Sequence, residues 1–280
     1  MLQIFKTVLL LSFLGTFLII LMLVLKPVFV KNFPAKIQVI MWILIAISMC
    51  IPFWKMIPKD DAKKITPKYN LSQTDTKFID DNIKDFFAED NSFEDVSFPI
   101  INDTRINVAK LLLNVWLFGI CIFLMIIVIS YVRFVLDKRK NSENAQSLVF
   151  DEVKKLLHIK RNIRLKISKS VFSPCLVGCI FPIVYSPHGN IENKTEKMIF
   201  MHELTHYKQK ALLIKWLFIF VSAIHWFNPF VYLMLSNISQ SLEVSCDMAV
   251  VKKLSDDEKT FYMNTILDLI ENEKRRIKND

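Results

Sequence analysis

Three long apolar runs dominate the first half of the chain. Residues 8–25 and 37–54 each hold 18 consecutive positions without a charged side chain, and residues 111–132 form a third run of the same kind. A helix rises 1.5 Å per residue, so about 20 such residues cross the roughly 30 Å of hydrocarbon in a bilayer. The pattern therefore predicts three transmembrane helices within a membrane region that covers residues 1–136.

The basic residues between and after these runs predict how the helices are oriented. Residues 26–36 carry three lysines and no acid, and four basic residues lie within residues 133–140. Because basic loops remain on the cytoplasmic side, both segments are expected there, and the loop 55–110 is expected outside. The formal net charge of +9 then indicates contact with anionic lipid. The basic residues show no nucleic-acid-binding pattern, so no direct contact with nucleic acid is expected.

The pattern changes after the third run, and residues 137–280 read as a separate domain facing the cytoplasm. Residues 163–187 are rich in β-branched side chains and punctuated by proline and glycine, which predicts two or three short strands. Residues 211–227 are apolar but end at an Asn-Pro pair, which favours a helix associated with the membrane over a further span. The expected fold is an α+β membrane protein whose second domain is mainly helical with a small β-sheet.

The segment FMHELTHYKQK, residues 200–210, carries the pattern H-E-x-x-H. On a helix, His202 and His206 lie one turn apart on the same face, so both imidazoles can hold corners of a tetrahedral zinc site. Glu203 lies between them in sequence and can act as a general base beside the metal. The pattern is short enough to occur by chance, so a third ligand is needed to support it.

The third ligand is expected on a later helix. The positions at which metzincins carry glycine and histidine are occupied here by Gln209 and Leu212, which excludes that class. The gluzincin alternative needs a later glutamate, and the segment LEVSCDMAV supplies Glu243 as a ligand. Asp247 follows one turn later on the same face and is expected to accept the N–H of a ligand histidine. The competing interpretation is a solvated acidic helix face.

Other polar residues offer further choices for the site. His225 could replace Glu243 as the third ligand, although its apolar surroundings are more typical of a core histidine. Tyr185, Tyr207 and Tyr232 are all candidate donors to an oxyanion, and nothing in the pattern chooses among them.

The order of the motifs resembles that of the BlaR/MecR family of membrane metallopeptidases, known for β-lactam sensor-transducers. The resemblance rests on three N-terminal apolar runs followed by SPCLVGCIFPIVYSP, HELTH, WFNP and EVSCD. It implies a gluzincin-like domain with one Zn²⁺, in which the ligands are His202, His206 and Glu243 and the base is Glu203.

The same resemblance implies where a substrate would bind. The strand region from Pro174 to Tyr185 would form the edge to which an extended substrate adds by backbone pairing. Three residues of this region are candidate substrate contacts: Pro174, Gly178 and Pro182.

The resemblance also implies a function, namely a multi-pass cell-membrane zinc endopeptidase in signal transduction. It would cleave a cytoplasmic repressor of the BlaI/MecI type, and so act as an antirepressor in antibiotic resistance, or cleave itself. Its partners would include the lipid bilayer and either a second copy of the chain or a separate sensor subunit. Two alternatives stay open: a quality-control protease of the Ste24/HtpX type, and a non-enzymatic signalling protein with a structural zinc site.

The sequence departs from the sensor members of this family at its C-terminal end. Those members continue into another span and an extracellular penicillin-binding domain with an S-x-x-K serine. This sequence stops at Asp280 and contains no S-x-x-K. We therefore expect a short form, natural or truncated, that does not itself bind β-lactams.

Overall fold

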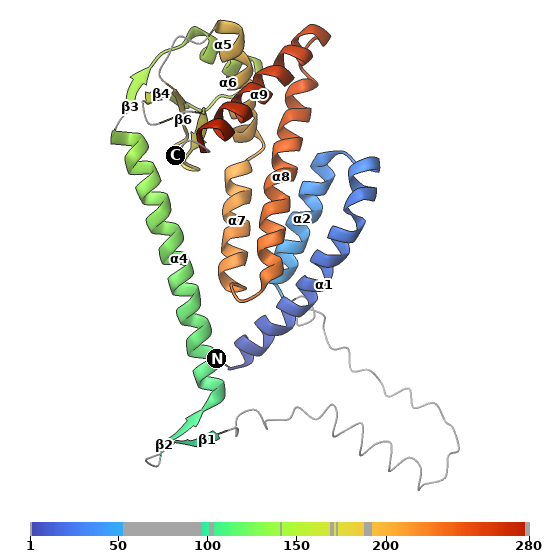
Figure 1. Ribbon diagram of the computed structural model, residues 1–280, viewed down its shortest axis with the longest axis vertical. Helices are drawn as coiled ribbons and strands as arrows, with labels where there is room; N and C mark the ends of the chain where they lie inside the picture. Colours follow the sequence, from blue (N-terminus) through green and yellow to red (C-terminus); the bar gives the residue numbers. More distant parts are fainter. Residues whose placement is uncertain are drawn as a thin grey trace, which may run out of the picture.

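The computed structural model describes residues 2–52, 97–100, 104–140, 142–168, 171, 173–187 and 192–277. A helical bundle occupies one end of the molecule, and a unit of helices and strands occupies the other (Figure 1). Most of the predicted outside loop 55–110 lies beyond the described residues. Within its last part, strands β1 (Ser97–Ile100) and β2 (Thr104–Asn107) form a short antiparallel hairpin.

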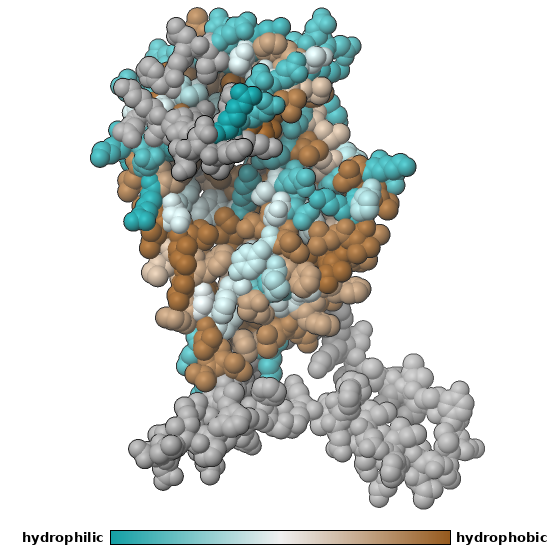
Figure 2. Space-filling view, viewed as in Figure 1, coloured by the Kyte–Doolittle hydropathy of each residue, from teal (hydrophilic) through white to brown (hydrophobic). Residues whose placement is uncertain are grey.

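The apolar runs form the helices of the bundle. These helices are α1 (Leu2–Asn32), α2 (Ala35–Cys50), α4 (Val108–Lys140), α7 (Ala211–Ile224) and the first part of α8 (Pro229–Val251). Only α1 and α4, among the described helices, are both long and apolar enough to cross a membrane. Figure 2 shows a broad apolar zone across the visible face of the bundle and a more hydrophilic surface at the other end of the molecule.

The second apolar run forms a shorter helix than its composition predicts. Helix α2 has 16 residues, or about 24 Å of rise, and it ends at Cys50 because Pro52 cannot continue the helical hydrogen-bond ladder. A third membrane-spanning helix over residues 37–54 therefore stays a prediction. The helices at the first and third runs, with 31 and 33 residues, extend beyond the predicted spans and are long enough to cross a membrane.

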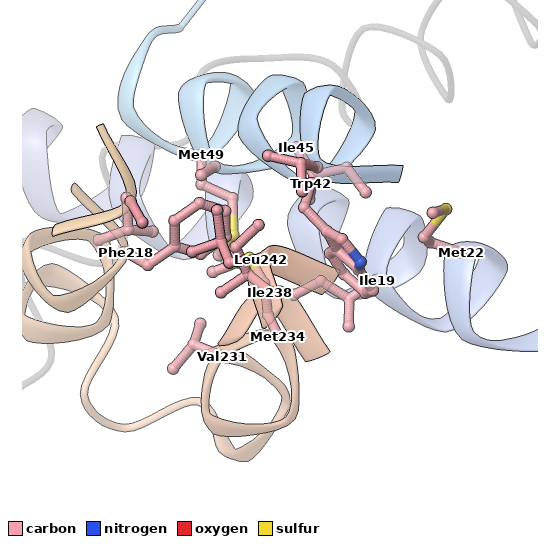
Figure 3. Packing of buried hydrophobic residues seen from close by; sticks show 14 residues of the cluster. Ile19, Met22, Trp42, Ile45, Met49, Phe218, Val231, Met234, Ile238 and Leu242 are labelled. Carbon is pink, nitrogen blue, oxygen red and sulfur yellow. The ribbon is translucent and has the colours of Figure 1, made fainter. Parts of the chain in front are cut away.

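The core of the bundle lies where α1, α2, α7 and α8 meet (Figure 3). Helix α8 contributes four fully or almost fully buried side chains, Val231, Met234, Ile238 and Leu242, at spacings of three and four residues. This spacing places them in one stripe along the helix, which packs against α2 and α7. At the polar end of the stripe, the ammonium group of Lys26 in α1 donates to the side chains of Asn237 (2.7 Å) and Gln240 (2.9 Å) in α8.

Hydrogen bonds of the Asn228 side chain join the start of α8 to α1. The Oδ1 atom of Asn228 accepts the backbone N–H of Phe230 and so caps α8, in which Pro229 is the first residue. Its Nδ2 atom donates to the hydroxyl oxygens of Ser12 (2.9 Å) and Thr16 (2.7 Å) in α1. The Asn-Pro pair therefore starts a new helix, and α7 ends at Ile224, three residues earlier than expected.

Helix α4 is held to the bundle by two tryptophans. The indole N–H of Trp116 donates to the carbonyl of Ile224 at 2.9 Å, and the indole N–H of Trp226 donates back to the carbonyl of Trp116 at 3.2 Å. Gly119 makes this contact possible, because a Cβ atom at that position would overlap the Trp226 ring. Trp226, in the turn between α7 and α8, therefore packs directly against the backbone of α4.

The second unit is built on a four-stranded mixed sheet. Its strands are β3 (Ser142–Ala145), β4 (Arg164–Ser168), β5 (Cys175–Val177) and β6 (Ile183–Pro187), in the order β3-β4-β6-β5. The β4–β6 pair is parallel and the other two pairs are antiparallel, so β5 forms one edge of the sheet. The predicted small sheet in a mainly helical chain is confirmed, and it contains three strands within residues 163–187.

Helices α5 (Leu148–Leu156), α6 (Asn193–Lys208) and α9 (Asp256–Ile277) surround this sheet. Their apolar faces form a second core, in which Phe150 of α5, Phe200 of α6 and Tyr262 of α9 are buried. Val250, from the far end of α8, is fully buried in the same core. Helix α8 therefore belongs to both units of the molecule.

The contact of Gly119 with Trp226 predicts an unusual response to substitution. Glycine to alanine in a helix interior normally stabilises a protein by up to about 1 kcal/mol. Here Gly119→Ala should instead lower the unfolding free energy by about 1–3 kcal/mol, because the added methyl group enters an already filled contact. Thermal unfolding in detergent measures this, with Cys121→Ala on an exposed part of α4 as the control. A Gly119→Ala protein at least as stable as the wild type would contradict this packing.

Candidate metal centre

Helix α6 brings the two histidines of the H-E-x-x-H pattern together. The helix is anchored in the second core by completely buried side chains, including Met198, Met201 and Leu204. Its remaining face carries His202 and His206, whose rings are perpendicular with centroids 4.6 Å apart. Their Nε2 atoms are separated by 3.0 Å, so both nitrogens point at the same place.

Helix α8 adds the carboxylate of Glu243 to this pair. Its Oε2 atom lies 3.0 Å from Nε2 of His206 and 3.6 Å from Nε2 of His202. Ligand atoms of a tetrahedral metal with bonds of about 2.0–2.1 Å are roughly 3.3 Å apart, so the three atoms have the spacing of a metal-ligand set. The other carboxylate oxygen of Glu243 lies 3.3 Å from Nζ of Lys215 in α7.

The opposite nitrogen of His202 is held by Asp247 and Tyr262. Its Nδ1 atom lies 3.1 Å from Oδ1 of Asp247 and 2.9 Å from the Tyr262 hydroxyl, and that hydroxyl donates to the same Oδ1 at 2.6 Å. With the Nδ1 proton directed to these oxygens, Nε2 keeps its lone pair for a metal. Sequence reasoning found Asp247 through its spacing from Glu243. It missed Tyr262, which comes from α9 and belongs to no motif.

Cys246 is a second candidate for the third ligand. The potential ligand atoms of His202, His206 and Cys246 lie within 4.8 Å of one another. The thiol is buried, donates to the carbonyl of His202 at 3.3 Å and lies 3.8 Å from Nδ1 of the same residue. Since the carboxylate of Glu243 lies against both Nε2 atoms, its position agrees better with a shared metal than that of the thiol.

The electrostatics of the cluster stabilise positive charge between its side chains. Burial raises the pKa of Glu243, but hydrogen bonds from both histidines and the charge of Lys215 outweigh burial and hold this pKa well below its usual range. Burial lowers the pKa of His206, but hydrogen bonds with Cys246 and Glu243 outweigh it, and the pKa lies at about 9. These shifts show that the side chains of the cluster stabilise a positive charge between them, as they would for a bound cation.

Glu203 lies between this cluster and the edge of the sheet. Burial raises the pKa of its carboxyl group, and this outweighs the neighbouring histidine charges, which lower it. The backbone of Leu176, in edge strand β5, lies near the same carboxylate and acts in the opposite direction, lowering its pKa. A raised pKa brings a carboxylate closer to the range in which it can exchange protons at neutral pH.

The three predicted substrate contacts surround β5. Pro174 precedes the strand and is buried, as is Pro182 just before β6. Gly178 follows β5 with a φ of 89°, a left-handed conformation that a side chain would strain, so the turn itself requires glycine here. A substrate would reach this region through the strand backbone, and the three roles stay predictions.

The other predicted candidates lie elsewhere. His225 is completely buried in the bundle, with Nε2 3.2 Å from the carbonyl of Met49. Tyr232 donates its hydroxyl proton to the carbonyl of Trp226, and Tyr185 of β6 is buried in a cluster with Val177.

Removal of the Tyr262 hydroxyl should weaken metal binding even though all proposed metal ligands remain. Tyr262→Phe should weaken metal binding by about tenfold, because partners of this kind orient the ligand histidine. Competition with a chelator measures the effect, and Tyr232→Phe, which also loses a tyrosine hydroxyl, serves as the control. Equal metal affinity in the two variants would show that Asp247 alone holds His202.

Comparison with known proteins identifies the family. The family described as BlaR1 peptidase M56 matches residues 6–279. The chain is 25% identical over 238 residues to the methicillin resistance mecR1 protein of Staphylococcus aureus strain Mu50, covering 81% of this chain and 39% of that protein. It is 26% identical over 183 residues to the regulatory protein BlaR1 of Bacillus licheniformis, covering 63% of this chain and 30% of the relative.

The chain thus spans well under half of the length of these curated relatives. The match nevertheless includes both the bundle and the metal cluster, and it agrees with the resemblance drawn from the motifs. The chain therefore belongs to the BlaR1 peptidase M56 family of membrane metallopeptidases.

Proposed function

We propose that this chain is a zinc endopeptidase embedded in the cell membrane that acts in signal transduction. The observation that carries the proposal is the convergence of two imidazole nitrogens and one carboxylate oxygen from α6 and α8. A set of His, His and Glu donors is typical of catalytic zinc sites, which keep a fourth position open. In the proposal, His202, His206 and Glu243 hold the zinc, and Asp247 supports His202.

The neighbouring residues would divide the chemistry of peptide hydrolysis. A zinc ion at this position would act as a Lewis acid, which makes water more acidic and a peptide carbonyl easier to attack. Glu203 would take a proton from the attacking water and return it to the amine that leaves. Lys215, beside the outer oxygen of Glu243, would keep that carboxylate ionised and oriented.

The free edge of β5 would align the substrate. An extended peptide can add to an exposed sheet edge through backbone hydrogen bonds, largely independently of its sequence. Because the backbone of β5 at Leu176 lies near Glu203 and β5 packs against α6, a peptide along this edge would pass close to the proposed base.

The position of the basic segments supports a catalytic unit that faces the cytoplasm. The α1–α2 connection and the C-terminal end of α4 lie at the same end of the molecule as the sheet (Figure 1). The connection carries lysines, and the end of α4 carries lysines and arginines, which favour the cytoplasmic side. The relatives are named for regulation and methicillin resistance, which supports a repressor of the BlaI/MecI type, or the chain itself, as the substrate.

The role of Glu203 gives the central test. The Glu203→Gln variant, purified in detergent, should keep about one zinc per chain and lose at least about a hundredfold in cleavage, because the base is removed and the ligands remain. Cleavage of the chain itself and of a co-expressed repressor is followed by gel electrophoresis and mass spectrometry. Equal cleavage by wild type and variant would exclude this enzymatic function and favour a structural zinc site.

The choice of third ligand gives a second test. Glu243→Gln should weaken zinc retention far more than Cys246→Ser, because the carboxylate lies against both Nε2 atoms and the thiol lies against Nδ1 of His202. Zinc content after dialysis against a chelator measures retention, and His225→Gln, in the bundle, is the control. Greater loss in Cys246→Ser would assign the thiol as the ligand.

A further inference from the structure

A cavity of about 540 Å³ lies between the bundle and the catalytic unit. It is bounded by the start of α2, the end of α6, the start of α7 and the second half of α8. Its apolar wall consists of Ala35, Val39, Ile40, Ile43, Ile214, Leu242, Met248 and Ala249. A cavity of this size is in the range of small-molecule sites, and its walls suit a hydrocarbon chain.

Five lysines surround this apolar wall. They are Lys36 in α2, Lys208 and Lys210 at the α6–α7 junction, and Lys252 and Lys253 at the end of α8. None of the residues that line the cavity is acidic, and within the described part of the chain none of the five lysines forms an ion pair with a carboxylate. Burial lowers the pKa of Lys253, and the positive charge of Lys208 lowers it further. Among the described residues, the charges of these lysines are therefore not balanced by a carboxylate.

The cavity lies at the boundary between the apolar and the polar parts of the molecule. Its α2 wall begins at Pro34, next to the α1–α2 connection, and continues into the bundle through Val39 and Ile43. Figure 2 shows the apolar zone giving way to hydrophilic surface at the level of this connection. In a membrane this is the level of the lipid headgroups, so the lysines would meet headgroups and the apolar wall would meet acyl chains.

We propose that this cavity binds one anionic phospholipid, with its phosphate among the lysines and the upper part of an acyl chain along α2. A free phosphate would leave the apolar wall exposed to water, and a neutral lipid would leave the lysine charges unbalanced. An anionic phospholipid satisfies both features with one molecule.

The bound lipid would also contact the helices that carry the metal cluster. Leu242 and Ser245 line the cavity from α8, and they are sequence neighbours of Glu243 and Cys246. Thr205 of α6 and Gln209, the residue that follows α6, also line it, and the Gln209 amide donates to the Ser245 carbonyl at 3.0 Å. The lipid would therefore stabilise the packing of α6 against α8, and it would do so whether or not the chain is a peptidase.

Binding of defined lipids to the full chain in detergent tests the proposal. Dioleoyl phosphatidylglycerol should raise the unfolding temperature and remain bound as one molecule per chain in native mass spectrometry. Dioleoyl phosphatidylcholine and inorganic phosphate, at equal concentration, should do neither. If phosphatidylcholine had the same effect as phosphatidylglycerol, the cavity would bind lipid through its apolar wall alone. If inorganic phosphate had the same effect, the cavity would be an anion site. Either result would overturn the proposal.

Two matched double variants test the part played by the lysines. Lys252→Gln with Lys253→Gln should weaken phosphatidylglycerol binding by about thirtyfold, because each lysine near an anionic lipid contributes about fivefold. Lys154→Gln with Lys155→Gln removes two charges from α5, outside the cavity, and should leave binding unchanged. Equal weakening in both variants would show general attraction between charges and overturn the proposal.

A third variant keeps every lysine and fills the cavity. Ala249→Phe should abolish one-to-one retention of the lipid. Unfolding in the absence of lipid shows whether each variant still folds. Ala249→Phe protein that folds and binds phosphatidylglycerol like the wild type would place the lipid elsewhere.

Discussion

The position of the metal cluster depends on a single continuous helix, α8, that packs in two cores at once. Its first half is buried in the bundle through residues such as Met234 and Ile238, and its last turn is buried beneath the sheet through Val250. Glu243 lies between these two anchored parts. The carboxylate can therefore meet the histidines of α6 only while the bundle and the second unit keep their relative orientation.

The cluster is also tied to the last helix of the chain, which the H-E-x-x-H pattern alone does not suggest. Tyr262 comes from α9, is almost completely buried, and reaches both Asp247 and His202. In this way the final helix orients a histidine that lies 60 residues earlier. The side chain that packs α9 into the second core therefore also orients the His202 ring.

Sequence reasoning succeeded where a helical period decides the geometry. Spacings of four residues predicted that His202 and His206 share one face, as do Glu243 and Asp247, and the structure brings these side chains together. The sequence does not predict contacts between distant segments, such as Asn228 with Ser12 or Tyr262 with His202, because no local pattern encodes them. The length of α2 was overestimated, since apolar composition continues past the point where Pro52 ends the helix.

The hydrogen bonds of Lys26 have a mechanical consequence. One ammonium group on α1 holds Asn237 and Gln240 of α8, and Gln240 lies only three residues before Glu243. A displacement of α1 along its axis would therefore pass to α8 within one turn of this carboxylate.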